Sequence, residues 1–128
     1  MPEDRREYGA SPTARTLRDR ALVELHFPSA TRELEVEGTR GYLFPLDTEL
    51  GDHFDLFAWF DGSAYQVRVL RPRLAGLDPH ACHLFRDGRI CFGQGDGGGA
   101  STLKEAHARS VLWANGIGAY LRGSRFPF

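Results

Sequence analysis

The spacing of apolar residues predicts a helix near each end of the chain. In residues 11–27, Leu17, Ala21, Leu22 and Leu25 recur at helical spacing, and Pro28 ends the pattern. In residues 102–121, Thr102 and Glu105 have the spacing of a capping box, which marks the start of a second helix. The residues that line one face of this second helix are Leu103, Ala106, Ser110, Val111, Ala114, Ile117 and Leu121.

Alternation of apolar and polar residues predicts strands between the two helices. Residues 33–38 and 40–46 are each typical of a strand. Residues 53–70 form the clearest hairpin, because two β-rich runs flank Asp61-Gly62, a dipeptide that supplies the positive φ angles of a tight turn. Within the second run, Tyr65, Val67 and Val69 are expected to be buried, and Gln66 and Arg68 to face water.

The order of these elements predicts an α+β fold. It comprises an N-terminal helix, an antiparallel meander of about four strands, an irregular segment and a C-terminal helix, with the helices at one side of the sheet. A chain of 128 residues is expected to form one domain, here residues 11–128 after a flexible terminus of residues 1–10.

Composition narrows the classes of function. The formal net charge is −1, which gives no global attraction to nucleic acid, and the short cluster Arg68, Arg71 and Arg73 is interpreted as a solvated strand edge. The chain has no run of about 18 apolar residues for a membrane span and no apolar core of a signal peptide, so we expect a cytoplasmic protein. The two cysteines are then expected to be reduced.

The segment from residue 79 to residue 102 concentrates the candidate chemistry, and three interpretations are open. His80, Cys82, His83 and Cys91 are all zinc-ligand types, but adjacent Cys82 and His83 would point opposite ways in extended backbone, and no Cys-x2-Cys knuckle is present. The segment could instead be a buried structural turn at Asp87-Gly88. In the third interpretation, Cys91 is a nucleophile at the point where the chain surfaces before a glycine-rich loop, with His83 or His80 nearby.

The stretch "ACHLFRDGRICF" resembles the active-site strip of ubiquitin-conjugating enzymes. In that family a His-Pro-Asn triplet precedes an Asn-Gly or Asp-Gly turn, and a short strand then carries the catalytic cysteine. Here the turn and strand are Asp87-Gly88 followed by Ile90-Cys91-Phe92. The positions of the triplet hold Ala81, Cys82 and His83, so the triplet itself is absent; a lone histidine before the turn is similar to the bacterial branch of the superfamily.

The resemblance implies that Cys91 accepts the C-terminal carboxyl of a ubiquitin-like protein from an E1-like adenylating enzyme as a thioester and passes it to a target protein. His83 would donate an N–H to the oxyanion or act as a base towards the nucleophile, with His80 as an alternative. Asp96, in the glycine-rich loop, could orient the nucleophile. No cofactor is implied, and the bacterial branch makes antiphage defence plausible, although no residue here indicates it.

Two other functions stay open beside this one. The first is a non-catalytic module that binds a ubiquitin-like protein, although the inactive relatives that do so lack the cysteine. The second is a zinc-stabilised domain that uses the four His and Cys residues. Cys82 is expected to be a core residue or a bystander, and His107 a satisfied histidine that faces largely inward from the second helix.

Overall fold

The computed structural model describes residues 12–74, 76–92 and 98–126. The predicted flexible terminus, residues 1–10, lies outside these ranges. The elements, in chain order, are α1 (Pro12–His26), β1 (Arg32–Val36), β2 (Thr39–Asp47), β3 (His53–Phe60), β4 (Tyr65–Arg71) and α2 (Leu103–Leu121). The predicted α+β order, with two helices around an antiparallel meander, is therefore confirmed.

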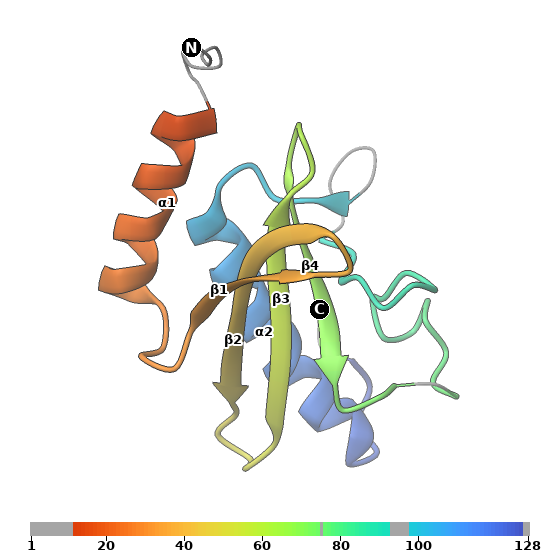
Figure 1. Cartoon of the computed structure of the whole chain (residues 1–128). Helices are drawn as coiled ribbons and strands as arrows, with labels where there is room; N and C mark the ends of the chain where they lie inside the picture. Colours follow the sequence, from red (N-terminus) through yellow and green to blue (C-terminus); the bar gives the residue numbers. More distant parts are fainter. Residues whose placement is uncertain (1–11, 75, 93–97, 127–128) are drawn as a thin grey trace.

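The four strands form one sheet in the order β1-β2-β3-β4, with every neighbouring pair antiparallel. Figure 1 shows α2 packed behind this sheet, α1 beside the β1–β2 side, and the chain between β4 and α2 on the opposite side. The core lies between the sheet and α2, where Phe44, Leu56, Val67 and Ile117 are fully buried. No helix in the described ranges is both long and apolar enough to cross a membrane.

Helix α1 ends where the sequence predicts, at His26, two residues before Pro28. Its contacts with the core come from Leu22, Val23 and the following Phe27. Leu17 and Leu25 are 59% and 77% exposed. The helical spacing of these leucines therefore marks the helix but not its packed face.

The β3–β4 hairpin is confirmed, but its turn is longer than the two residues expected. The backbone N–H of Asp61 donates to the carbonyl of Ala64 (2.9 Å), and the Asp61 carboxylate accepts the N–H groups of Ser63 and Ala64 (2.8 Å each). Gly62 has a φ of 107°, whereas Asp61 is outside the positive-φ region. The Asp61 carboxylate thus stabilises the turn by accepting two of its backbone N–H groups.

The prediction that Gln66 faces water is wrong, because the residue is only 3% exposed. The chain that returns after β4 covers this face: Ala100 pairs with Tyr65, and Arg89 bridges to Arg68. The Gln66 amide is paired on both sides, since Nε2 donates to Asp61 (2.9 Å) and Oε1 accepts from Arg89 (3.3 Å). Burial of this polar group is compatible with the fold because its hydrogen bonds are made.

Helix α2 begins at the predicted cap. The Thr102 side chain accepts the N–H of Glu105 (3.0 Å). The Glu105 carboxylate accepts the hydroxyl of Ser101, the residue before the cap (2.8 Å). Leu121, predicted on the same face as Leu103, is 48% exposed. The buried positions also include Trp113, Gly116 and Gly118, so the packed face is broader than the predicted one.

The prediction that His107 is a satisfied histidine is wrong for one ring nitrogen. Its Nε2 is buried and has no hydrogen-bond partner in the described part of the chain. The ring packs against Phe27 and Phe44, with centroids 4.4 and 5.5 Å away. Burial, with a smaller contribution from the charge of His26, lowers the pKa of His107 below its usual value.

Candidate functional site

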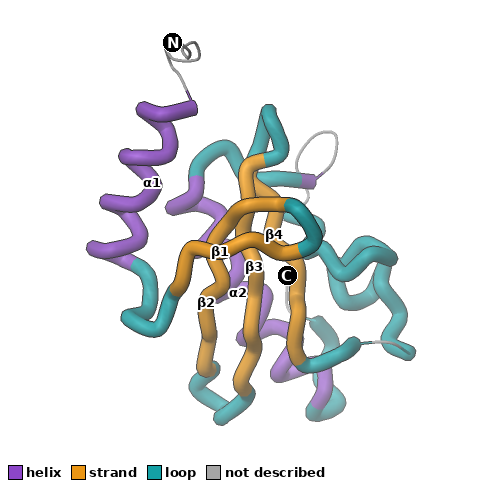
Figure 2. The backbone as a smooth tube through the Cα atoms, viewed as in Figure 1, coloured by secondary structure: helices purple, strands orange, loops and turns teal. Residues whose placement is uncertain are grey.

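The candidate site lies in the segment between β4 and α2, which has no helix or strand of its own over residues 76–92 (Figure 2). Backbone hydrogen bonds attach this segment to the edge of the sheet. The N–H of Ile90 donates to Val67 (2.8 Å), and the N–H of Val69 donates to Gly88 (3.0 Å). The site is therefore held by β4, away from α1 (Figure 1).

Residues 83–91 form a short hairpin around the predicted Asp87-Gly88 turn. Phe85 donates its N–H to Arg89 (2.8 Å), and Gly88 donates back to Phe85 (3.0 Å). Gly88 has a φ of 91°, the left-handed conformation for which glycine is suited. At the open end of the hairpin, the Cys91 N–H donates to the carbonyl of His83 (2.9 Å), so the chain places these two residues opposite one another.

Alternation along this short extended run turns Cys91 away from the core. Its neighbours Ile90 and Phe92 are buried, at 1% and 7% exposed, whereas Cys91 is of intermediate exposure and not disulfide-bonded. Successive side chains of extended backbone point to opposite sides, so anchoring Ile90 and Phe92 in the core fixes the thiol outward. The prediction that Cys91 lies where the chain surfaces is confirmed.

His83 has an unusual backbone conformation for its residue type. Residues 78–84 form a helical turn in which the Cys82 N–H donates to Asp78 (3.1 Å) and the Leu84 N–H reaches back to Pro79 (2.8 Å). The hydrogen bond from Leu84 to Pro79 spans six residues, as at the C-terminus of a helix, and places His83, with a φ of 57°, at the left-handed position that glycine usually takes. The His83 ring contacts the ring of Phe126 at a tilt of 34°, with centroids 4.7 Å apart.

Two grooves meet at His83 and Cys91. The first has a volume of about 510 Å³ and is lined also by Asp78, His80 and Arg86. The second has a volume of about 270 Å³ and is lined also by Phe92, Arg109, Leu112, Trp113 and Phe126. The structure thus brings together Cys91, His83 and His80, while Asp96 lies outside the described residues.

Cys82 is a core residue, as predicted, with no exposed surface. Burial raises the pKa of its thiol. The described residues contain no group of three or more His, Cys, Asp or Glu side chains that could hold a metal ion. The four predicted zinc ligands are therefore not assembled, because Cys82 points into the core while Cys91 and His83 line surface grooves.

Three further residues of the site were not identified from the sequence. The Trp113 indole N–H donates to the Cys82 carbonyl (2.9 Å), which attaches the His83 turn to α2. Arg109 donates to the Phe92 carbonyl (3.1 Å), and Phe126 contacts His83. None has a local sequence signal, because each contact depends on how α2 and the C-terminal residues pack on the hairpin.

The arrangement combines a cysteine and a histidine where two surface grooves meet. Cys91 is partly exposed, His83 lies across the hairpin from it by a backbone hydrogen bond, and the grooves are open rather than enclosing. No family model, no curated protein and no solved structure matches this chain.

Proposed function

We propose that this protein is a carrier of the ubiquitin-conjugating type, in which Cys91 accepts the C-terminal acyl group of a ubiquitin-like protein and transfers it to a target. One observation carries the proposal. Cys91 is turned outward by its two buried neighbours, directly after the Asp87-Gly88 turn and opposite His83. The resemblance of this strip to ubiquitin-conjugating enzymes supplies the class of donor, and the order helix, meander, irregular segment and helix is compatible with it.

The chemistry has two acyl transfers. In the first, the Cys91 thiolate attacks the carbonyl carbon of the ubiquitin-like protein bound to the thiol of an E1-like adenylating enzyme; the new C–S bond forms, the old one breaks, and the enzyme's thiolate leaves. In the second, a nucleophile on the target attacks the same carbon, loses its proton, and Cys91 leaves as thiolate. ATP is consumed by the adenylating enzyme, so the carrier itself uses no cofactor.

The histidines have separable roles in the second transfer. His83 lies opposite Cys91 and lines both grooves, so it is positioned to donate an N–H towards the oxyanion. His80 is exposed and lines only the first groove, where it can accept the proton of the incoming nucleophile. Asp96 is kept as a candidate for orienting that nucleophile.

The test is a thioester assay. The protein is incubated with ATP and the ubiquitin-like and adenylating proteins encoded near it, and adducts are resolved by non-reducing gel and intact mass. We expect an adduct that thiols remove, that Cys91→Ala abolishes, and that the matched Cys82→Ala variant retains because Cys82 is buried. The absence of an adduct with active partners, while the ubiquitin-like protein still binds, would establish the non-catalytic module instead.

A further inference from the structure

A second surface adjoins the groove that contains Cys91. It is a trough of about 260 Å³ between the end of β4 and the hairpin of residues 83–91. Much of its lining is apolar, formed by Val69, Leu70, Leu74, Leu77 and Leu84, and the one carboxylate among the lining residues, Asp87, is paired with Arg89. The trough and the Cys91 groove share Pro79, Leu84, Phe85 and Arg86, so the two adjoin one another.

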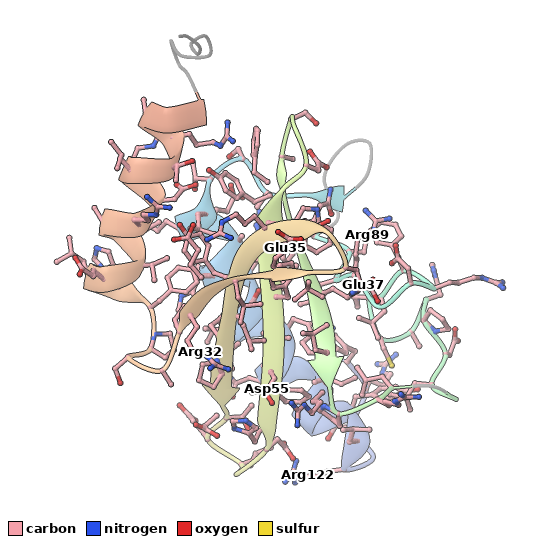
Figure 3. All side chains as sticks on the ribbon, in the orientation of Figure 1. Arg32, Glu35, Glu37, Asp55, Arg89 and Arg122 are labelled. Carbon is pink, nitrogen blue, oxygen red and sulfur yellow. The ribbon has the colours of Figure 1, made fainter. Side chains whose placement is uncertain are left out.

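Two arginines of this trough differ from the other arginines around it in having no carboxylate partner among the described residues, whereas the others are paired. Arg68 pairs with Glu37 (3.3 Å), Arg71 with Asp55 (3.7 Å), and Arg89 with Asp87 (2.8 Å). Glu37 and Arg89 lie on the β4 side of the molecule in Figure 3, and Asp55 lies lower on the sheet. Most of the positive charge near this edge is therefore already balanced by carboxylates.

Arg73 and Arg86, in contrast, are exposed and line the trough, and neither has an ion pair within the described residues. The sequence singled out Arg73 only as part of a solvated strand edge. In the structure it belongs to a largely apolar trough, together with Arg86, the second guanidinium that no carboxylate of the described residues pairs with. Guanidinium groups beside an apolar lining are complementary to a peptide that presents carboxylates next to an apolar side chain.

We propose that this trough docks the acceptor protein through a segment that combines an apolar residue with Asp or Glu, and so delivers the acceptor's nucleophile to Cys91. This inference rests on the proposed function. The direction of approach follows from the two grooves. The groove beside α2 is lined by Phe92, Leu112 and Trp113 and shares no lining residue with the trough. The groove that adjoins the trough is lined by His80, the group assigned to take the nucleophile's proton.

The test uses two fluorescent peptides with one central lysine each. The first places leucine and two glutamates beside the lysine, and the second is identical except that glutamine replaces both glutamates. The protein is loaded at Cys91, the adenylating enzyme is quenched, and discharge to each peptide is followed as a single turnover. We expect discharge to the acidic peptide to be about fivefold faster, the effect of two exposed ion pairs, and the difference to shrink in 0.5 M salt.

The variant Arg73→Gln, at a residue that lines the trough but not the Cys91 groove, is expected to reduce this preference while loading and discharge to free lysine stay unchanged, and Arg73→Gln/Arg86→Gln is expected to remove the preference. The matched control is Arg32→Gln, an exposed arginine on β1, and it should keep the preference. A loaded protein that discharges equally to both peptides, or a preference that survives in the double variant, would overturn the docking proposal.

Failure of loading would be a separate result. In that case the proposed function is wrong, and docking is judged by fluorescence anisotropy of the same two peptides with the unloaded protein. Binding of the acidic peptide that is weakened about fivefold in the double variant and not in Arg32→Gln would support the trough alone. Equal binding by all three proteins would overturn it.

Discussion

Replacement of His83 by glycine tests whether its left-handed backbone is retained for the sake of its side chain. A residue with a Cβ at a φ of 57° is less stable there than glycine by about 1 kcal/mol. The contact of its ring with Phe126 offsets this by roughly 0.5–1 kcal/mol. We therefore expect His83→Gly to unfold with a free energy within about 1 kcal/mol of the wild type.

His83→Ala separates these two contributions. Alanine loses the contact with Phe126 but gains no backbone relief, so its free energy of unfolding should lie about 1 kcal/mol below that of His83→Gly. Urea unfolding of the three proteins measures this difference. Discharge from the Cys91 thioester should fall roughly 100-fold in both variants, because both lack the imidazole.

Glu37 provides a matched control for the backbone argument. It is the other non-glycine residue in the described ranges with a positive φ, at 51°, and it lies in the turn between β1 and β2. Glu37→Gly should likewise be more stable than Glu37→Ala by about 1 kcal/mol, with no change in discharge. Equal stability of the two His83 variants would refute the conformational argument, and wild-type discharge in both would refute a chemical role for His83.

Three further results are expected. Because burial lowers the pKa of His107, the folded protein binds a proton on this imidazole more weakly than the unfolded chain, whose histidine titrates near 6.5. The free energy of unfolding should therefore fall as pH drops below about 6.5. His107→Leu should reduce this dependence on pH, as measured by urea unfolding at about pH 7.5 and about pH 5. Iodoacetamide should label Cys91 in the folded protein and Cys82 only after unfolding, as read by peptide mass. Trp113→Phe should lower the free energy of unfolding by about 1–3 kcal/mol, since the buried Cys82 carbonyl loses its indole donor, and thermal unfolding should show it.

Element boundaries could be predicted where a local signal sets them. Pro28 ends the first helix and Thr102 begins the last, because each acts within one turn of its own position. The exposure of Gln66 could not be predicted in this way. Alternation makes its face of β4 the wet one, but the chain that returns through Arg89 and Ala100 covers it, and that path is decided by tertiary packing.

The candidate site shows the same division. The turn at Gly88 and the outward direction of Cys91 follow from local residues, since the neighbours of the cysteine are large and apolar. The contact of the Phe126 ring with His83 does not follow from them, because it joins the C-terminal residues to the hairpin. Arg73 illustrates the limit most clearly: its charge is visible in the sequence, but whether a carboxylate of the described chain pairs with it depends on which residues fold beside it.

The details that favour a carrier over a binding module are those that binding alone would not require. A surface that only binds a ubiquitin-like protein needs complementary area, which neither an outward thiol between Ile90 and Phe92 nor a histidine in a glycine-type conformation supplies. Backbone strain of this kind is retained when surrounding contacts impose it, here the turn closed by Leu84 on Pro79 and the hydrogen bond of Cys91 to His83. The same hydrogen bonds that hold His83 in this conformation also place it opposite the thiol, so strain and nucleophile belong to one local structure. If no thioester forms on Cys91, the position of His83 opposite the thiol has no catalytic reason. The free energy of unfolding of His83→Gly then decides whether the left-handed conformation is only a consequence of the turn.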